Sequence, residues 1–176
     1  AADLALFVDA EALTAWRRRV DFARAHAPAL ELPPIDDARV LEAVLAATPG
    51  RASFAELRAM PAAELVRGGL SPAAVRAVER FAPEYVALPG RKRVPVHYEE
   101  DRPPWIESRI QDFFGLAESP RVASGAVPLV LHLLAPNRRA VQVTTDLTGF
   151  WAKHYPQLRN QLMRRYPRHK WPEHPG

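Results

Sequence analysis

The apolar positions in the first half of the chain recur at helical spacing. Leu13, Trp16 and Val20 lie three or four residues apart. Leu4 and Phe7 extend the same pattern towards the N-terminus. Residues at these separations share one face of an α-helix. We therefore predict an amphipathic helix that begins near the N-terminus and ends before the first proline.

Further helices are predicted before residue 84, and three of them begin at an N-cap residue. The first follows Asp36 or Asp37, either of which can cap it. Its apolar face is formed by Val40, Leu41, Val44 and Leu45. Ser53 and Glu56 have the spacing of a capping box, and Ser71 precedes a proline at the first helical position. One more turn of helix lies between these two caps.

The pattern changes near residue 85, where short runs typical of β-strands begin. Residues 85–88 and 94–98 form two such runs joined by a tight turn, and a proline restricts the second run to an edge or a bulge. Residues 127–134 are an apolar run of strand length. Residues 141–144 provide its return strand after a turn at residues 136–139. These runs predict hairpins.

Helical segments are predicted among and after these strands. One follows a Pro-Pro pair and ends at Gly115. Its inward residues are Trp105, Ile106, Ile110, Phe113 and Phe114. Thr145 or Asp146 caps another, and a further helix begins at the next proline. The apolar side of the capped helix carries Leu147, Phe150, Trp151 and Tyr155. The proline-rich residues 167–176 are expected to run along the surface.

These elements predict an α+β fold. Residues 1–84 form an N-terminal helical subdomain, and residues 85–176 form a small, mostly antiparallel sheet packed with helices. The spacing of the strands does not decide which of them pair.

The composition adds limits on compartment and membrane association. The chain has no cysteine, which excludes disulfides and suits a reducing compartment such as the cytoplasm. No apolar run approaches the roughly 18–20 residues that span a bilayer, so no membrane partner is expected. The chain begins in the middle of a helical pattern, without an initiator Met or a signal peptide, so a processed or truncated chain is expected.

The residues alone indicate no active site. The chain contains no GxxxxGK[ST] or GxGxxG sequence, and no HExxH arrangement among its six histidines. The acidic cluster at residues 99–101 is typical of a solvated turn, and no GxSxG sequence surrounds a serine. We therefore predict no catalytic residue, no metal site and no cofactor in this chain, which should neither bind nor hydrolyse ATP.

Charge separates the two halves of the chain and points to its C-terminal end. Residues 1–88 carry ten Lys or Arg against twelve Asp or Glu, whereas residues 151–176 carry six against one glutamate. Cations mixed with aromatic rings can pair with phosphates while bases stack on the rings. The candidate nucleic-acid contacts are Lys153, Arg159, Arg164, Arg165, Arg168, Lys170 and Trp171. A solvated surface without a polyanionic partner explains the charges equally well.

Four short sequence motifs in the C-terminal half of the chain occur together in one helicase family. They are RIQDFFG at residues 109–115, VLHLLAP at 130–136, AVQVTTDL at 140–147 and RYPRHKWP at 165–172. In this order they resemble the C-terminal region of HrpB-type DEAH-box ATP-dependent helicases. Two positions depart from the family pattern, Trp105 in place of an aliphatic residue and His174 in place of an acidic one.

The resemblance implies a parent helicase whose motor lies outside this sequence. Two RecA-like domains, a winged helix, a helical bundle and an OB-like domain would precede this region, and ATP and Mg²⁺ would bind in the motor. It implies an accessory role for this chain, with RNA or the motor domains of the same parent as partners. The alternative is a structural or protein-docking module that binds no nucleic acid.

Overall fold

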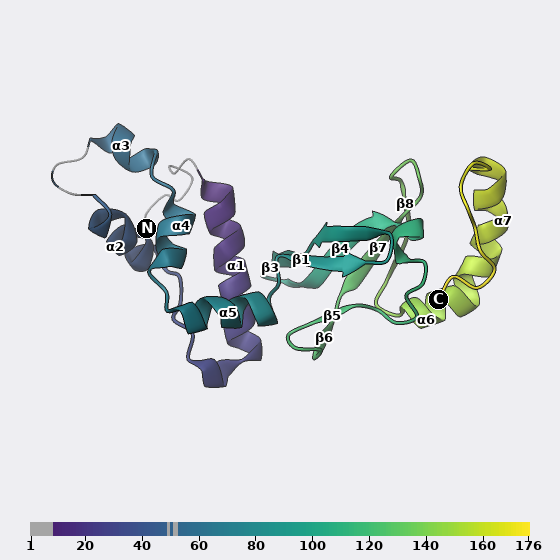
Figure 1. Cartoon of the computed structure of the whole chain (residues 1–176), viewed down its shortest axis with the longest axis horizontal. Helices are drawn as coiled ribbons and strands as arrows, with labels where there is room; N and C mark the ends of the chain where they lie inside the picture. The colour runs from purple at the N-terminus through teal and green to yellow at the C-terminus, as the bar shows by residue number, and fades with distance from the viewer. Residues whose placement is uncertain (1–8, 49, 51–52) are drawn as a thin grey trace. The chain divides into compact units, whose positions relative to one another are not determined.

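The computed structural model describes residues 9–48, 50 and 53–176 and divides the chain into two compact units. The first unit comprises residues 1–82 and the second residues 83–176. The predicted helical positions Leu4 and Phe7 lie outside the described residues. The two units together confirm the α+β class, since helices dominate the first and strands the second (Figure 1).

The first unit is a small bundle of helices. Its elements are α1 (Ala10–His26), the short 3-10 helix η2 (Pro28–Leu30), α2 (Asp37–Ala46), α3 (Phe54–Arg58), α4 (Ala62–Gly68) and α5 (Pro72–Phe81). The predicted caps are confirmed, because the side chains of Asp36 and Ser71 accept backbone N–H groups and Ser53 forms a reciprocal capping box with Glu56. The core of the unit is formed by Leu13, Trp16, Val20, Val40, Val44, Val66 and Val78.

Two leucines of α2 do not join this core, contrary to the prediction. Val40 and Val44 are buried, but Leu41 is 52% exposed and Leu45 55% exposed. Successive residues of an α-helix differ by about 100° around its axis. Leu41 and Leu45 therefore lie beside the narrow buried face that Val40 and Val44 form, and not on it. The apolar face of α2 is therefore wider than the surface that the rest of the first unit covers.

The second unit is built on a mixed four-stranded sheet in the order β3-β4-β7-β8. Its strands are β1 (Tyr85–Leu88), β2 (Arg91–Pro95), β3 (His97–Glu99), β4 (Arg102–Arg109), β5 (Arg121–Val122), β6 (Val127–Pro128), β7 (Val130–Leu134) and β8 (Ala140–Thr144). The predicted hairpins β1–β2 and β7–β8 are confirmed, and β5 and β6 form a third pair. Strands β4 and β7 are parallel, and the other pairs are antiparallel.

The predicted helix over residues 105–114 is wrong in its first half, because residues 105–109 belong to strand β4. Its register with β7 runs without a break from Trp105 opposite Val130 to Arg109 opposite Leu134. Burial alternates along β4, with Ile106 fully buried and Ser108 2% exposed between half-buried neighbours. Only the 3-10 helix η3 (Ile110–Phe113) follows the helical prediction. Trp105 stacks on His97 of β3, with ring centroids 3.9 Å apart.

The C-terminal helices follow the sheet as predicted. Asp146 accepts the backbone N–H of Gly149 and begins α6 (Leu147–Gly149), which continues as the π-helical segment η4 (Phe150–His154) and α7 (Tyr155–Arg165). Leu147, Phe150 and Tyr155 are fully or almost fully buried. These side chains form the core of the second unit together with Ile106, Ile110, Phe113, Leu129, Leu131 and Leu133.

Residues 167–176 are mostly exposed, as predicted, but two of them, Trp171 and Pro175, are buried. Trp171 is 7% exposed, and its indole N–H donates to the carbonyl of Tyr166 at 3.1 Å. The carbonyl of Pro175 accepts the N–H of Gly115 at 2.6 Å. The segment after α7 therefore folds back and closes the core of the second unit.

Candidate nucleic-acid interface

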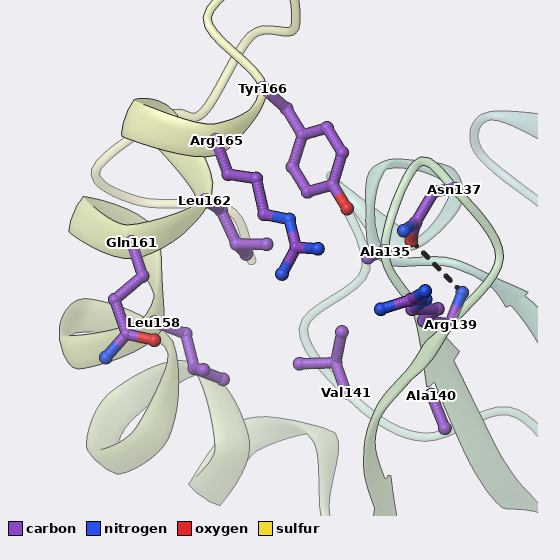
Figure 2. Close-up of a pocket in the computed structure, with 10 residues that line it drawn as sticks. All are labelled: Ala135, Asn137, Arg139, Ala140, Val141, Leu158, Gln161, Leu162, Arg165 and Tyr166. Carbon is purple, nitrogen blue, oxygen red and sulfur yellow. Dashed lines mark hydrogen bonds between the residues drawn. The ribbon is translucent and has the colours of Figure 1, made fainter.

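A groove of about 300 Å³ lies between α7 and the β7–β8 hairpin (Figure 2). Its helical wall is formed by Leu158, Gln161, Leu162 and Arg165, with Tyr166 at the end of the helix. Its other wall comes from the hairpin and comprises Ala135, Asn137, Arg139, Ala140 and Val141. Residues 158, 161, 162 and 165 have the spacing of one helix face, which is why they share the groove.

The groove is positively charged. The guanidinium groups of Arg165 and Arg139 both point into it, one from each wall (Figure 2). No Asp or Glu is among its lining residues. Arg165 also lies over the ring of Tyr166, with its guanidinium carbon 5.8 Å from the ring centroid. Two cations that face a solvent-filled groove without a carboxylate attract anions to it.

The hairpin wall of the groove is held by hydrogen bonds. The N–H of Arg138 donates to the carbonyl of Ala135 at 2.8 Å, and the N–H of Ala135 donates to the carbonyl of Arg139 at 2.9 Å. The side-chain oxygen of Asn137 accepts the N–H of Arg139 at 3.2 Å (Figure 2). These hydrogen bonds fix the backbone of the turn, and therefore the positions from which its side chains extend.

Two of the predicted contact residues hold the fold together instead. The Nε of Arg159 donates to the carbonyl of Trp171 at 2.9 Å, and its guanidinium lies 3.4 Å from the carboxylate of Glu173. The ring of Trp171 is buried among other rings, including Phe114 at 6.3 Å between centroids. Trp171 therefore offers no exposed face for a base, and the expectation of a stacking surface at this residue is corrected.

The remaining predicted cations are exposed but are not gathered in one place. Arg165 lies in the groove, whereas Lys153, Arg164, Arg168 and Lys170 are exposed and do not line it. Arg164 lies about 100° around α7 from Arg165, which turns it away from the hairpin wall. The described contacts give none of these four an ion pair.

Sequence reasoning missed the hairpin contribution to the groove. Arg138 and Arg139 were taken only as part of a turn, although two adjacent arginines in a short hairpin turn are a charge signal of their own. Arg139 faces the same groove as Arg165 because α7 lies beside the β7–β8 hairpin, which residue spacing does not reveal.

Two other polar groups of the second unit, Glu99 and Tyr155, are engaged in the fold. Glu99 accepts the indole N–H of Trp105 at 2.9 Å and lies 3.6 Å from Arg102. Burial raises the pKa of Tyr155 to about 12, against the opposing effect of the Arg159 guanidinium. Its hydroxyl donates to the carbonyl of Pro172 at 3.0 Å. Within the described residues, no group of three or more His, Asp or Glu side chains could hold a metal ion.

Comparison with known proteins places this fold in one family. The family described as ATP-dependent helicase C-terminal, HrpB_C, matches residues 44–175. The chain belongs to the HrpB C-terminal family. The match covers the strands of the second unit and part of the helical unit before it. It confirms the resemblance that the four sequence motifs indicated.

Two solved structures and one curated protein are similar to this HrpB_C chain. The ATP-dependent RNA helicase HrpB of Escherichia coli K12 is 34% identical over 153 residues, which cover 85% of this chain and 19% of that protein. A crystal structure of the E. coli DExH-box NTPase HrpB matches with a TM-score of 0.89 and 31% identity, over 97% of this chain and 22% of that chain. A crystal structure of the E. coli DEAH/RHA helicase HrpB matches with a TM-score of 0.73 and 32% identity, over 90% and 20%.

This HrpB_C chain therefore spans about a fifth of the length of the proteins it matches. In the part of the chain that the structure describes, no helix is long and apolar enough to cross a membrane.

Proposed function

We propose that this domain contacts single-stranded RNA through the groove between α7 and the β7–β8 hairpin, as an accessory part of an ATP-dependent RNA helicase. The observation that carries the proposal is the pair of guanidinium groups that face one groove without a carboxylate, Arg139 and Arg165. Guanidinium groups bind phosphate oxygens through paired hydrogen bonds. Binding to backbone phosphates requires no particular base sequence.

The surroundings of the groove suit a single strand better than a small ligand. The groove is open, and three further exposed cations, Arg164, Arg168 and Lys170, lie outside it on α7 and on the segment that follows α7. Tyr166 is half-buried, so the accessible part of its ring can contact a base next to a bound phosphate. Phosphates along a strand can then reach cations inside and outside the groove.

In this proposal the chain supplies binding, and the chemistry belongs to the rest of the helicase. ATP and Mg²⁺ bind in motor domains of the same parent protein, which are also the domain's partners within that protein. The strand that leaves the motor passes over the basic groove, in the cytoplasm, where we expect this helicase to act.

The proposal is tested by removing the two groove cations. Arg139→Gln with Arg165→Gln keeps a polar, shorter side chain at both positions and removes their charge. The two cations hold one phosphate between them, and the loss of one phosphate contact on a single strand reduces the salt slope of log affinity by about 0.7, so the double variant should lose roughly 0.7 of the slope. Fluorescence anisotropy with a labelled oligouridine at several salt concentrations measures both the affinity and the slope.

A charge-matched control comes from the first unit. Arg18 and Arg76 are exposed on α1 and α5, and Arg18→Gln with Arg76→Gln changes the net charge by the same amount. If the control weakens RNA binding as much as the groove variant, the attraction is a property of total charge and the groove is not the site.

A second candidate function is supported by the exposed leucines of α2. Leu41 and Leu45, with Leu30 at 46% exposure, leave an apolar surface on the first unit. Exposed apolar surface is typical of protein contacts. A bracing or docking module would show no RNA binding at low salt, and replacing both α2 leucines with Gln would change its association with the motor domains instead.

A further inference from the structure

A second polar pocket in the same unit shares the β7–β8 turn with the groove. It has a volume of about 320 Å³ and is lined by residues from three segments. Gly90 and Arg91 come from the β1–β2 turn, Glu107, Ser108, Arg109 and Asp112 from the end of β4 and η3, and Leu134 and Arg138 from the β7–β8 hairpin. Arg138 lines this pocket and its neighbour Arg139 lines the groove, so the turn carries one cation to each.

The walls of this second pocket are fixed by a close backbone contact. The N–H of Gly90 donates to the carbonyl of Asp112 at 3.0 Å. A Cβ atom at Gly90 would lie 2.7 Å from the Cα of Asp112, so only glycine allows the two segments to approach this closely. This contact sets Arg91 beside the segment that carries Arg109.

The charge of the pocket suits one phosphodiester group. Arg91, Arg109 and Arg138 are exposed, and the described contacts give none of them a carboxylate partner. The carboxylate of Asp112 already accepts the hydroxyl of Ser108 at 2.6 Å and the N–H of Arg109 at 3.2 Å. With Glu107, the lining residues carry three positive and two negative charges, and the formal excess of one positive charge balances one phosphodiester.

Arg138 occupies a backbone position that favours glycine. Its φ is +64°, in the left-handed region, at the end of the turn that closes β7 and β8. Side chains other than Gly and Asn are uncommon there because the Cβ atom crowds the backbone. Glycine at this position would make the same turn with less strain, so the turn itself does not require the Arg138 side chain.

We propose that this pocket, formed around Arg91, Arg109 and Arg138, binds a backbone phosphate of the same RNA strand that occupies the groove. The inference rests on the proposed function and adds a second contact point on the path of the strand. The strand crosses the β7–β8 turn, with one phosphate held by Arg139 and Arg165 and another by the three arginines. Recognition is of the phosphodiester and is independent of base sequence.

The decisive variant is Arg138→Gly in the 176-residue chain, because it removes the charge and the backbone strain together. We expect a melting temperature that is unchanged or higher. We expect the affinity for a labelled oligouridine to fall roughly 8-fold at 50 mM salt and roughly 3-fold at 200 mM, as the loss of one phosphate contact requires. Circular dichroism confirms the fold, and fluorescence anisotropy measures the affinity.

A second variant leaves the turn untouched. Arg91→Gln with Arg109→Gln removes two of the three cations that hold this one phosphate and should reduce the salt slope by about 0.7. Arg18→Gln with Arg76→Gln is the charge-matched control and should retain the wild-type slope, since neither residue belongs to the second unit.

The possible results separate this inference from the proposed function. If the pocket variants bind as the wild type does, while Arg139→Gln with Arg165→Gln weakens binding, the pocket is not a phosphate site and the groove proposal stands. If the wild-type chain binds no oligouridine at 50 mM salt, both are overturned. Loss of affinity in the pocket variants with the control unchanged supports both.

Discussion

Truncation of Trp171 should unfold the second unit more easily and leave its RNA affinity nearly intact. The ring is 7% exposed, packs edge-on against Phe114, and donates its N–H to the carbonyl of Tyr166. Replacement of a buried tryptophan by alanine costs about 3–5 kcal/mol from the lost burial and the cavity that remains. The carbonyl left without its donor adds to this cost.

The expected loss for Trp171→Ala is therefore at least about 3 kcal/mol in the free energy of unfolding. Trp171→Phe separates the two contributions, because it keeps an aromatic ring in the core and removes only the N–H and part of the volume. We expect it to cost about 1–2 kcal/mol, the scale of one lost hydrogen bond with limited repacking.

Urea denaturation followed by far-ultraviolet circular dichroism measures both variants without relying on tryptophan fluorescence. RNA affinity is then measured at a temperature and urea concentration where each variant remains folded. A Trp171→Ala chain that loses less than about 1 kcal/mol of stability but binds RNA much more weakly would refute the reasoning, since the ring would then be a binding surface.

Three other perturbations test separate parts of the structure. Gly90→Ala should destabilise the second unit by about 1–3 kcal/mol, because the added Cβ meets the backbone of Asp112 at 2.7 Å; equal urea midpoints would contradict this. Burial raises the pKa of Tyr155 to about 12, so folding favours its neutral form, and stability should fall as pH rises above about 10, the value in the unfolded chain. Tyr155→Phe should lose less stability than the wild type over that pH range, measured by urea titrations at pH 9 and 11. Ser53→Ala removes a capping box and should cost about 1 kcal/mol, whereas Ser53→Thr should cost little in the same assay.

The helical unit was predictable because its signals are local. A cap such as Asp36 or Ser71 acts on backbone groups two or three residues away, so the sequence around it contains both partners of the interaction. The exposure of Leu41 and Leu45 was not predictable in the same way. It depends on how much of α2 the other helices cover, and this is set by packing between segments.

Strand β4 shows why the second unit was harder to predict. Its apolar residues Trp105 and Ile106 fit helical spacing with Ile110 of η3, but the strand lies between β3 and β7 and is hydrogen-bonded on both sides. The period-2 signal was weakened by Ser108, a polar residue that is buried because its hydroxyl donates to Asp112. Pairing across the sheet decides the conformation of such an ambiguous segment.

The candidate site was predictable only in part for the same reason. Arg165 could be predicted as a contact residue because it lies in the basic residues 151–176. The motif at residues 165–172 also helps to identify the family. Arg139 and the pocket around Arg138 belong to the candidate site because of where the β7–β8 turn lies, which the sequence does not show. Trp171 does not belong to it, because the end of the chain folds back and buries the ring.

The most direct test of the central claim is the salt dependence of RNA binding by the unmodified chain. Fluorescence anisotropy with a labelled oligouridine at 50 and 200 mM salt should show an affinity that falls about 2.6-fold from the one phosphate held in the groove, at about 0.7 of slope. With the second phosphate, held by the three arginines of the pocket, the fall should reach roughly 7-fold. Absence of binding at 50 mM, or an affinity that changes less than about twofold between the two salt concentrations, would contradict the claim that this domain holds RNA by its phosphates.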